Sequence, residues 1–470
     1  MKNKFTSYLS DIRFWILLTF LIKLIGITDP PIEIGHNWRQ TTVTMVARNF
    51  MEVDNNILYP RIDIAGEKTG ITGMEFPVFN YLIYLFSLLL GYEHWFGRLI
   101  NLIVSSFGAW YFYKIIFRHF NQKVAFNATI ILLFSIWFSF SRKIMPDTFA
   151  VSIVIAGMYY CSNYLDKKTI FHLLIGSILI GTGVLSKLPS GVVLTPFVLI
   201  LFSKKYTIYT KISFSTVLSL FLIPSLFWYF YWVPYLNIQF EFWHFFMGKS
   251  FQNGLQEFID QSPLFLEKFY GTTLFYIGFI TSIIGVFFAL KSKYKFLLWI
   301  FGISLFSILI ILFKSGLTFA HHTYYMIPFI PAMALVAGFG ITKIPLQSIS
   351  LLLLIGIVAE GILNQHVDFR IPEQHQNLIS LEEDLNQVSD SSDLILINSG
   401  DVPTPMYLAH RKGWVANNSS LQNQDFIEAH KMKGLKLIVV LKEAFGTNIE
   451  LPYAKLKEND YYTFYSLTKP

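Results

Sequence analysis

The chain has 470 residues, of which 53% are hydrophobic and only 14% carry charge, against about a quarter in soluble globular domains. This composition excludes a disordered protein, a coiled coil and an ordinary soluble enzyme, and it indicates a protein whose solvent is largely lipid. One cysteine excludes a disulfide framework or a multi-cysteine metal site, and the net charge of +7 falls in short clusters rather than a basic stripe, so we expect no nucleic acid partner.

Eleven apolar runs approach or reach the roughly 17 to 25 residues that a helix needs to cross a bilayer. They fall near residues 12–27, 98–117, 124–140, 148–165, 169–186, 190–203, 213–235, 272–290, 296–313, 324–342 and 346–363. No small-residue cleavage site follows the first run, so we expect it to be retained as a helix rather than removed as a signal peptide.

A further apolar run, 77–90, is ambiguous, and the charge of the loops decides its placement. If it crossed the bilayer, Lys114, Arg118 and Lys123 would lie outside. If it lies flat at the interface, these residues and the other basic loop clusters all fall in the cytoplasm, as the positive-inside rule requires. We therefore predict eleven spans, with the N-terminus inside and the C-terminus outside.

The tail differs in character from the rest of the chain because it is polar. Its strand-like runs at 393–398 and 435–441 each follow a helical stretch, near 375–387 and 424–433. We therefore expect an all-α polytopic membrane protein over residues 1–363, followed by a small soluble α/β domain over residues 364–470 on the outer face.

The first outer loop, residues 29–97, is predicted to hold interfacial helices. From Gln40 onward, apolar residues recur at helical spacing, at Val43, Val46, Ala47, Phe50 and Met51. The polar residues Arg39, Arg48, Asn49 and Glu52 fall off this stripe. Such a helix either braces the membrane surface or carries polar side chains to the mouth of a cavity between spans.

Several charged residues lie next to apolar segments on the outer side. Glu75 precedes a proline-led apolar run, where a carboxylate is costly unless it is paired, with Arg39 or Arg61 as the candidate partners, or used in chemistry. Asp147, in the short connection 141–147, either caps the next helix or takes part in a site. Lys187 stands at another tight turn, which suits a phosphate ligand or an interfacial anchor equally.

Histidines and aromatic residues also gather on the outer side. His321 and His322 are adjacent and point in different directions on a helix, so we expect no shared metal, and binding of a phosphate or hydroxyl by one histidine and one tyrosine is the stronger interpretation. The aromatic loop 240–246 is interpreted as interfacial packing, or as a lid or sugar-stacking wall. The cations suit a lipid-linked phosphate, and the carboxylates suit a general base.

These motifs, in this order, resemble bacterial membrane glycosyltransferases of the GT-C class. The similarity is to the family-39-like group related to dolichyl-phosphate-mannose-protein mannosyltransferases and aminoarabinose lipid A transferases. The residues that carry it are WRQTT at 38–42, ARNF at 47–50, YPRID at 59–63, EFP at 75–77, Arg98, Arg142 with MPD at 145–147, KLP at 187–189, HTYY at 322–325 with Pro328, and RKGW at 411–414.

The resemblance implies a GT-C fold in the bacterial cytoplasmic membrane, with the active site and the C-terminal domain facing the periplasm or exterior. The donor would be a sugar on a polyprenyl phosphate, transferred with inversion to a protein, lipid or glycan acceptor. The residues expected to bind substrate are Arg39, Arg48, Arg61, Arg142, Lys187, His322, Tyr324 and Tyr325.

One departure from the family pattern affects the catalytic base. Related enzymes usually place an acidic residue just before the helix of the first outer loop, but residues 35–40 contain no Asp or Glu. The base assignment therefore stays open among Glu75, Glu33, Asp147 and His36. We favour Glu75, because its place before Pro77 resembles that of the family's acidic residue.

Other functions also fit the composition. A transporter or flippase would show ionisable residues or broken helices at mid-membrane and inverted repeats between the two halves of the chain. Lys23 lies in the first span and Glu360 near the end of the last, but we see no paired half-helices, and the large outer loop and outer domain fit a transporter poorly. A polysaccharide polymerase or ligase would use a diphosphate-linked glycan, and a non-catalytic scaffold would follow if the missing carboxylate meant lost activity. No acidic cluster demands a metal, so we expect no cofactor and a metal-independent reaction.

Overall fold

The computed structural model describes residues 9–244 and 248–467, and its packing divides the chain into two compact units. The first unit comprises Met1–Ile27, Gly97–Phe230 and Phe246–His366, and the second comprises Thr28–Phe96, Tyr231–Phe245 and Val367–Pro470. The division at His366 lies close to the predicted boundary after residue 363. The first outer loop, however, clusters with the tail rather than with the membrane helices.

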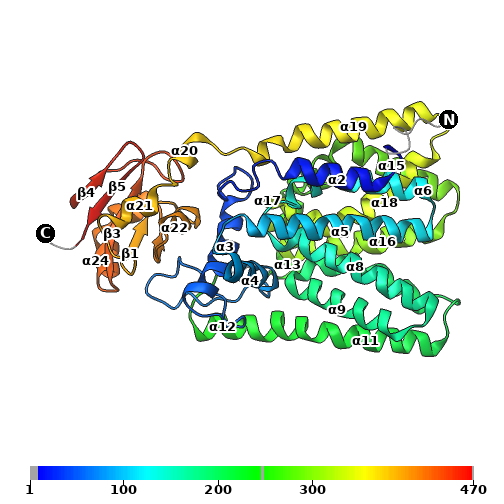
Figure 1. The fold of residues 1–470 in the computed structure, drawn as a ribbon, viewed down its shortest axis with the longest axis horizontal. Coiled ribbons are helices and arrows are strands. Elements are labelled where there is room, and N and C mark those ends of the chain that lie inside the picture. The colour runs from blue at the N-terminus through cyan, green and yellow to red at the C-terminus, as the bar shows by residue number, and fades with distance from the viewer. Residues whose placement is uncertain (1–8, 245–247, 468–470) are drawn as a thin grey trace. The chain divides into compact units, whose positions relative to one another are not determined.

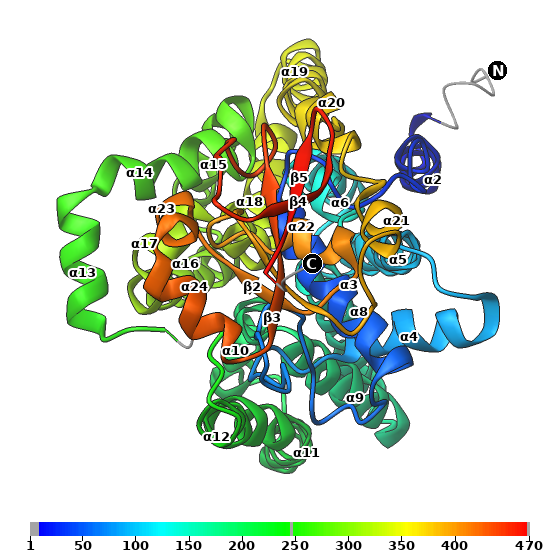
Figure 2. The ribbon, with the colours of Figure 1, turned by 90° about the vertical axis from the view of Figure 1, so that its left-hand side faces the viewer.

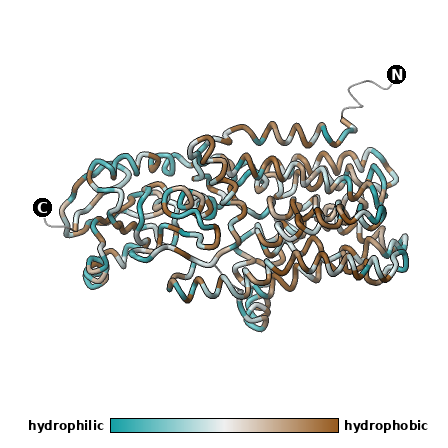
Figure 3. The backbone as a smooth tube through the Cα atoms, turned by 60° about the horizontal axis from the view of Figure 1, so that its bottom comes forward, coloured by the Kyte–Doolittle hydropathy of each residue, from teal (hydrophilic) through white to brown (hydrophobic). Residues whose placement is uncertain are grey.

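The first unit is a bundle of apolar helices, which run side by side in Figure 1 and carry the hydrophobic colour in Figure 3. Its α-helices are α2 (Ile12–Lys23), α5 (Phe96–His119), α6 (Gln122–Phe134), α7 (Trp137–Phe140), α8 (Pro146–Lys167), α9 (Ile170–Ser186), α10 (Val198–Phe202), α11 (Ile208–Phe227), α13 (Phe251–Asp260), α14 (Ser262–Glu267), α15 (Phe275–Lys291), α16 (Lys295–Ser315), α17 (Leu317–His321), α18 (Ile330–Lys343) and α19 (Gln347–Gln365). Tighter or wider helical turns are η1 (Leu188–Phe197), η2 (Trp228–Trp232), η3 (Lys268–Thr272), η4 (Thr323–Phe329) and η5 (His366–Phe369).

The protein is thus a mostly helical polytopic membrane protein with a small C-terminal α/β part, as predicted. Among the described residues, six helices are long and apolar enough to cross a membrane, and a seventh span results if the α14–η3 segment and α15, bent by 86°, are counted together. Helices also form at the other predicted runs, but they are shorter or irregular; α6, for example, has 13 residues. The number of eleven spans therefore stays a prediction.

Glycines bring α8 and α9 into close contact. A methyl group added at Gly157 would lie 2.6 Å from the Gly176 carbonyl oxygen, and one added at Gly183 would lie 2.8 Å from the Ala150 carbonyl oxygen. Small residues allow helix backbones to approach in this way in membranes, where van der Waals packing drives helix association. The close approach at Gly183 fixes the neighbouring ends of the two helices, where Asp147 and Lys187 lie.

Lys23 and Glu360, the two charged residues that bear on the transporter interpretation, both have structural partners. The Lys23 ammonium donates a hydrogen bond of 2.8 Å to the Ser141 hydroxyl and lies 5.2 Å from the centre of the Phe138 ring. The Glu360 carboxylate accepts hydrogen bonds from the backbone N–H groups of Tyr276 and Ile277, at the start of α15 just after the 86° bend. Broken helices are a feature that the transporter interpretation predicts, but here the bend is stabilised as a helix N-terminus by a carboxylate.

The second unit contains a five-stranded mixed sheet in the order β2-β1-β3-β5-β4. Its strands are β1 (Leu394–Ile397), β2 (Gly413–Val415), β3 (Leu435–Leu441), β4 (Ala454–Glu458) and β5 (Tyr462–Ser466). Its helices are α3 (Asn37–Glu52), α4 (Val78–Leu90), α12 (Val233–Gln239), α20 (Glu373–Gln376), α21 (Leu381–Asn386), α22 (Thr404–Ala409), α23 (Asn418–Gln422) and α24 (Gln424–Lys431). Strands β2, β1 and β3 are parallel, and β5 is antiparallel to β3 and β4. Figure 2 shows the sheet with α24 and α21 on opposite sides. The two strand-like runs recognised in the sequence are β1 and β3.

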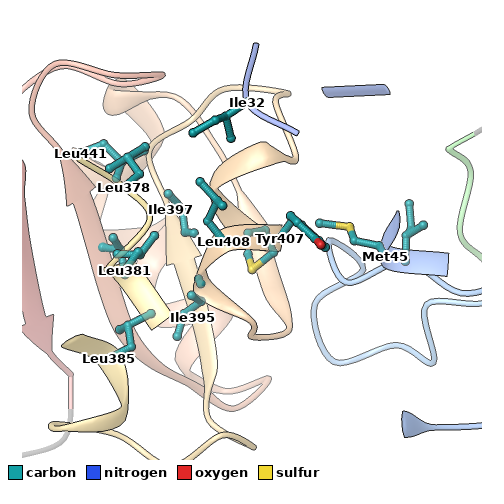
Figure 4. Packing of buried hydrophobic residues seen from close by; sticks show 14 of the residues in the cluster. Ile32, Met45, Leu378, Leu381, Leu385, Ile395, Ile397, Tyr407, Leu408 and Leu441 are labelled. Carbon is teal, nitrogen blue, oxygen red and sulfur yellow. The ribbon is translucent and has the colours of Figure 1, made fainter. Parts of the chain in front are cut away.

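A hydrophobic core joins the tail to the first outer loop. Figure 4 shows Leu381, Ile395 and Leu408 of the tail in one cluster with Met45 of α3. All four side chains are at least nine-tenths buried. Because full burial of a large aliphatic side chain contributes about 1.5–3 kcal/mol, this cluster is a major source of stability for the second unit.

Helix α3 forms where the sequence predicts it, but its surroundings differ from the expectation. From Gln40 to Phe50 every residue is buried, including Arg48 and Asn49. The threonines of its polar face bond to carbonyls of their own helix; Thr42, for example, donates to the Trp38 oxygen at 2.8 Å. The polar face of α3 is therefore covered by protein and hydrogen-bonded to its own helix, and the position of this helix at the membrane interface stays a prediction.

Candidate active site

The connection between α7 and α8 is held in place by Asn101 on α5. The Asn101 amide donates hydrogen bonds of 2.9 and 2.8 Å to the carbonyl oxygens of Phe140 and Lys143, and its own oxygen accepts a hydrogen bond of 3.0 Å from Thr148. All these groups are buried, where hydrogen bonds are strong and missing ones are costly. Asn101, which the sequence analysis did not single out, thus fixes the loop that leads to Asp147.

Asp147 and Lys187 form a buried ion pair inside the first unit. Asp147 lies in the first turn of α8 after Pro146, but the N-cap residue is Met145 and makes no side-chain capping bond, so Asp147 is not the cap that one interpretation predicted. Its carboxylate oxygen lies 3.4 Å from the Lys187 ammonium, which follows the last residue of α9. The two side chains are only 4% and 9% exposed, so water screens their charges weakly.

An aromatic ring lies beside Lys187. Its ammonium lies 5.2 Å from the centre of the Tyr324 ring, within reach of a cation–π interaction. Tyr324 in turn stacks on His322 and on Tyr325, with ring centres 5.3 and 5.0 Å apart. Five residues predicted from the sequence are thus brought into one cluster, which we call the membrane cluster: Asp147, Lys187, His322, Tyr324 and Tyr325.

A tyrosine that the sequence analysis missed orients the Lys187 turn. The Tyr229 hydroxyl accepts a hydrogen bond of 3.2 Å from the Leu188 N–H and donates one of 3.0 Å to the Leu185 carbonyl oxygen. The turn is therefore fixed on both sides of Lys187. Tyr229 lies in an aromatic run, and this composition alone does not distinguish it from interfacial packing.

Arg142 binds backbone carbonyls just beyond the C-terminal end of α2. Its guanidinium donates hydrogen bonds of 2.8 and 2.5 Å to the carbonyl oxygens of Ile25 and Gly26, just beyond α2. A cation at the C-terminal end of a helix satisfies its free carbonyls and its dipole. These bonds explain the buried charge of Arg142 without a substrate.

In the second unit, Arg39 and Glu75 form a buried ion pair. Arg39 lies in the first turns of α3, and its guanidinium donates a hydrogen bond to the Glu75 carboxylate. The side chains are 7% and 5% exposed. The predicted pairing with Arg39 is therefore present, whereas Arg61 pairs instead with Asp54 at 2.8 Å.

The other two candidates for the base lie at the start of α3. Glu33 is buried and accepts a hydrogen bond of 2.8 Å from the Gln40 amide. His36 precedes the helix and has a left-handed backbone with φ of 60°. Glu33 thus provides a buried carboxylate near the helix start, although it lies before the position where the related enzymes carry theirs.

Arg48 is engaged in a network of the second unit. Its guanidinium donates to the Asp63 carboxylate at 2.9 Å and to the Tyr407 carbonyl oxygen at 3.2 Å. Asn49 donates to the other oxygen of Asp63 at 2.8 Å. Arg48 and Arg61 therefore both pair with acidic residues, as Arg39 and Lys187 do, and their expected role in substrate binding stays a prediction.

One further ionisable group, His244, lies within electrostatic reach of the Arg39–Glu75 pair. Burial, together with the charge of Arg39, lowers the pKa of His244 to about 4, against the opposing effect of Glu75. The sequence analysis placed this residue in the aromatic loop 240–246 but gave it no role; residues 245 and 246 of that loop lie outside the described residues. No group of three metal-ligating side chains occurs in the part of the chain that the structure describes.

Comparison with known proteins agrees with the resemblance seen in the sequence. A family model described as dolichyl-phosphate-mannose-protein mannosyltransferase matches residues 74–230. No curated protein sequence matches the chain. The fold matches ArnT from Cupriavidus metallidurans bound to undecaprenyl phosphate, with a TM-score of 0.55, 12% identity, and coverage of 96% of this chain and 98% of that one.

A second solved structure with the same fold is an oligosaccharyltransferase of Archaeoglobus fulgidus in complex with zinc and sulfate. It has a TM-score of 0.59 and 12% identity, with coverage of 91% of this chain and 67% of that one. The chain therefore has the fold of GT-C glycosyltransferases and resembles the mannosyltransferase family, as predicted. The matched segment 74–230 contains Glu75, Arg142, Asp147 and Lys187.

Proposed function

We propose that the protein is a glycosyltransferase that moves a sugar from a polyprenyl-phosphate donor to an acceptor at the outer face of the bacterial cytoplasmic membrane, with inversion at the anomeric carbon. The observation that carries the proposal is the buried Asp147–Lys187 pair, at the ends of two apolar helices within the segment that matches the mannosyltransferase family. Ionisable residues buried among membrane helices commonly mark functional sites.

Lys187 is the proposed ligand of the donor phosphate. When the bond from the anomeric carbon to the phosphate oxygen breaks, its electrons pass to the phosphate, and a nearby ammonium stabilises the added negative charge. Asp147 supports this role, because its carboxylate lies 3.4 Å from the ammonium and offsets part of the cost of burying it. The hydroxyls of Tyr324 and Tyr325 and the ring of His322 are further candidate ligands.

Glu75 is the proposed general base, which takes the proton of the acceptor as the acceptor oxygen bonds to the anomeric carbon. Its buried ion pair with Arg39 supports the assignment, since the guanidinium holds the carboxylate in one orientation. Asp147, Glu33 and His36 remain the alternatives. No step in this scheme requires a metal or a cofactor.

Lipid mass spectrometry on a strain lacking the gene tests the proposal. We expect one polyprenyl monophosphate sugar to accumulate, and its mass identifies the sugar as a hexose or a pentose. The intact gene should reverse the accumulation, whereas Glu75→Gln should not. An unchanged polyprenyl-phosphate pool would contradict the proposal, and full activity of Glu75→Gln would move the base to Asp147, Glu33 or His36.

An oligosaccharide transferase is the second candidate. The fold match to the archaeal oligosaccharyltransferase favours it, although a match at 12% identity supports the fold rather than the substrate. Such an enzyme, like a polysaccharide polymerase or ligase, would leave a diphosphate-linked oligosaccharide to accumulate in the same experiment.

A further inference from the structure

The end of α12 and the loop that follows it are attached to the segment that leads to Glu75. The Gly73 N–H donates a hydrogen bond of 2.8 Å to the Asn237 side chain, although the two residues are 164 positions apart. The Thr72 hydroxyl donates to the Phe242 carbonyl oxygen at 3.3 Å, and the Lys68 ammonium donates to the Glu241 carbonyl oxygen at 2.6 Å. Three contacts thus hold residues 237–242 along residues 68–73.

The contact at Gly73 leaves no space for a side chain. A methyl group there would lie 2.5 Å from the Val233 side chain, 2.6 Å from its carbonyl oxygen and 2.9 Å from the Asn237 oxygen. Real carbon atoms do not approach so closely, so only glycine fits. Glu75 follows two residues after Gly73, and His244 follows two residues after Phe242. The attachment therefore brings the end of the loop to the Arg39–Glu75 pair.

The protonation state of the His244 imidazole indicates which chemical groups it is able to bind. Its pKa of about 4 means that the imidazole is neutral at physiological pH, with one nitrogen that donates a hydrogen bond and one that accepts. Among residues 9–244 and 248–467, the ring has no hydrogen-bond partner, and it is only partly buried. A neutral ring suits a hydroxyl group, whereas a phosphate is better bound by a cation.

We propose that His244 is a substrate-binding residue of the Arg39–Glu75 site, and that its imidazole hydrogen-bonds a hydroxyl group of the donor sugar or of the acceptor. This inference rests on the proposed function. It adds a residue outside the segment that matches the mannosyltransferase family, which ends at residue 230. It also gives the aromatic loop 240–246 a polar contact with the substrate, in addition to the packing or sugar stacking expected from its sequence.

Three variants of the full-length protein test the proposal. His244→Phe keeps a ring of similar size but removes both hydrogen-bonding nitrogens, and His244→Gln restores a donor and an acceptor. Glu241→Gln is the matched control in the same loop, since the Glu241 side chain is 80% exposed, its carboxylate lies 3.7 Å from the Lys68 ammonium, and the substitution keeps the backbone carbonyl that accepts the Lys68 hydrogen bond. Each variant is expressed in the deletion strain, and the polyprenyl-phosphate sugar pool is measured. The purified variants are then tested for binding of undecaprenyl phosphate and of the sugar lipid extracted from the deletion strain.

We expect His244→Phe to lower transfer roughly 5- to 100-fold, the range for leaving one hydroxyl without its partner, and to leave the binding of undecaprenyl phosphate unchanged. His244→Gln should recover part of the loss, which a purely structural role would not allow, and Glu241→Gln should behave as the intact protein. Weaker binding of the sugar lipid by His244→Phe would assign the hydroxyl to the sugar, and unchanged binding with lost transfer would assign it to the acceptor.

Unchanged transfer in His244→Phe, or equal loss in His244→Phe and His244→Gln, would overturn the inference. If the deletion strain that expresses Glu75→Gln still accumulates the sugar lipid in that case, the proposed function stands without His244. If the deletion strain accumulates no such lipid, the proposed function fails, and the inference fails with it.

Discussion

The Asp147 carboxylate and the Lys187 ammonium lie 3.4 Å apart at the ends of α8 and α9, with almost no exposure to solvent. Taking both charges out of water is costly, and a hydrophobic pair of similar size is often as stable or more stable. A buried ion pair is therefore a weak source of stability, and for this reason we propose a functional role for the two charges.

If the Asp147–Lys187 pair has a function, removing both charges should restore the stability of the protein but not its activity. Asp147→Leu and Lys187→Met each leave one buried charge without its partner, which should destabilise the protein by about 3–5 kcal/mol. The double variant Asp147→Leu/Lys187→Met should recover most of that stability but no transfer activity. Thermal unfolding in detergent and complementation of the deletion strain measure the two effects. Recovery of transfer in the double variant would show that the pair is purely structural.

The close packing of α8 against α9 should set the distance between Asp147 and Lys187. Gly183→Leu places a side chain against the Ala150 carbonyl oxygen and Val154, so the ends of α8 and α9 must separate. We expect transfer to fall at least tenfold without any change in a charged residue, and the melting temperature to fall by several degrees. Gly302→Leu, where no atom lies within 4 Å of the added carbon, is the control and should be nearly neutral.

Arg48 should behave as a structural residue. Its removal leaves the buried Asp63 carboxylate without its ion-pair partner, so Arg48→Met should destabilise the second unit by about 3–5 kcal/mol. If the intact protein binds a polyprenyl phosphate as proposed, the folded fraction of Arg48→Met should bind it equally well. Weaker phosphate binding at unchanged stability would instead support the substrate-binding role considered from the sequence.

His410 makes the second unit sensitive to pH. Its two ring nitrogens lie 2.9 and 2.7 Å from carboxylate oxygens of Glu52 and Glu382, so the protonated ring satisfies both. The hydrogen bond with Glu52 raises the pKa of His410 above 6.5, and, against the effect of burial, the same bond lowers the pKa of Glu52 below 4.5. The stabilisation from His410 is complete below about pH 6.5 and is lost as pH rises through its folded-state pKa; that from Glu52 is complete above about pH 4.5 and is lost as pH falls.

The melting temperature of the second unit should therefore be highest between about pH 4.5 and 6.5 and decline toward pH 8. The effect should be on the order of 1 kcal/mol or less, because the three side chains are 33–46% exposed. His410→Gln should flatten this dependence, and His321→Gln, at an exposed histidine of the first unit, should leave it unchanged. An identical pH profile in His410→Gln would contradict the assignment.

The sequence predicts the helices well because hydropathy is a local property. Each apolar run coincides with helical structure, and β1 and β3 fall on the two strand-like runs of the tail. The Arg39–Glu75 pair was also among the predicted alternatives, since a carboxylate beside an apolar segment needs a partner.

The contacts that complete the candidate site lie far apart along the chain and leave no local pattern. Asn101, Tyr229 and His244 were missed for this reason, because each acts on a segment that only the fold brings near it. The burial of α3 was missed for another reason, since its threonines bond to carbonyls of their own helix, which allows a polar face to be covered.

The core shared by α3 and the tail has a consequence for biosynthesis. The three stretches of the second unit are separated by almost the whole bundle, so α3 leaves the ribosome long before Leu381, Ile395 and Leu408 are made. At typical elongation rates this interval is on the order of half a minute. During that time the nascent first outer loop lacks the side chains of the tail that cover it, so it is exposed to chaperones and proteases until the tail is made.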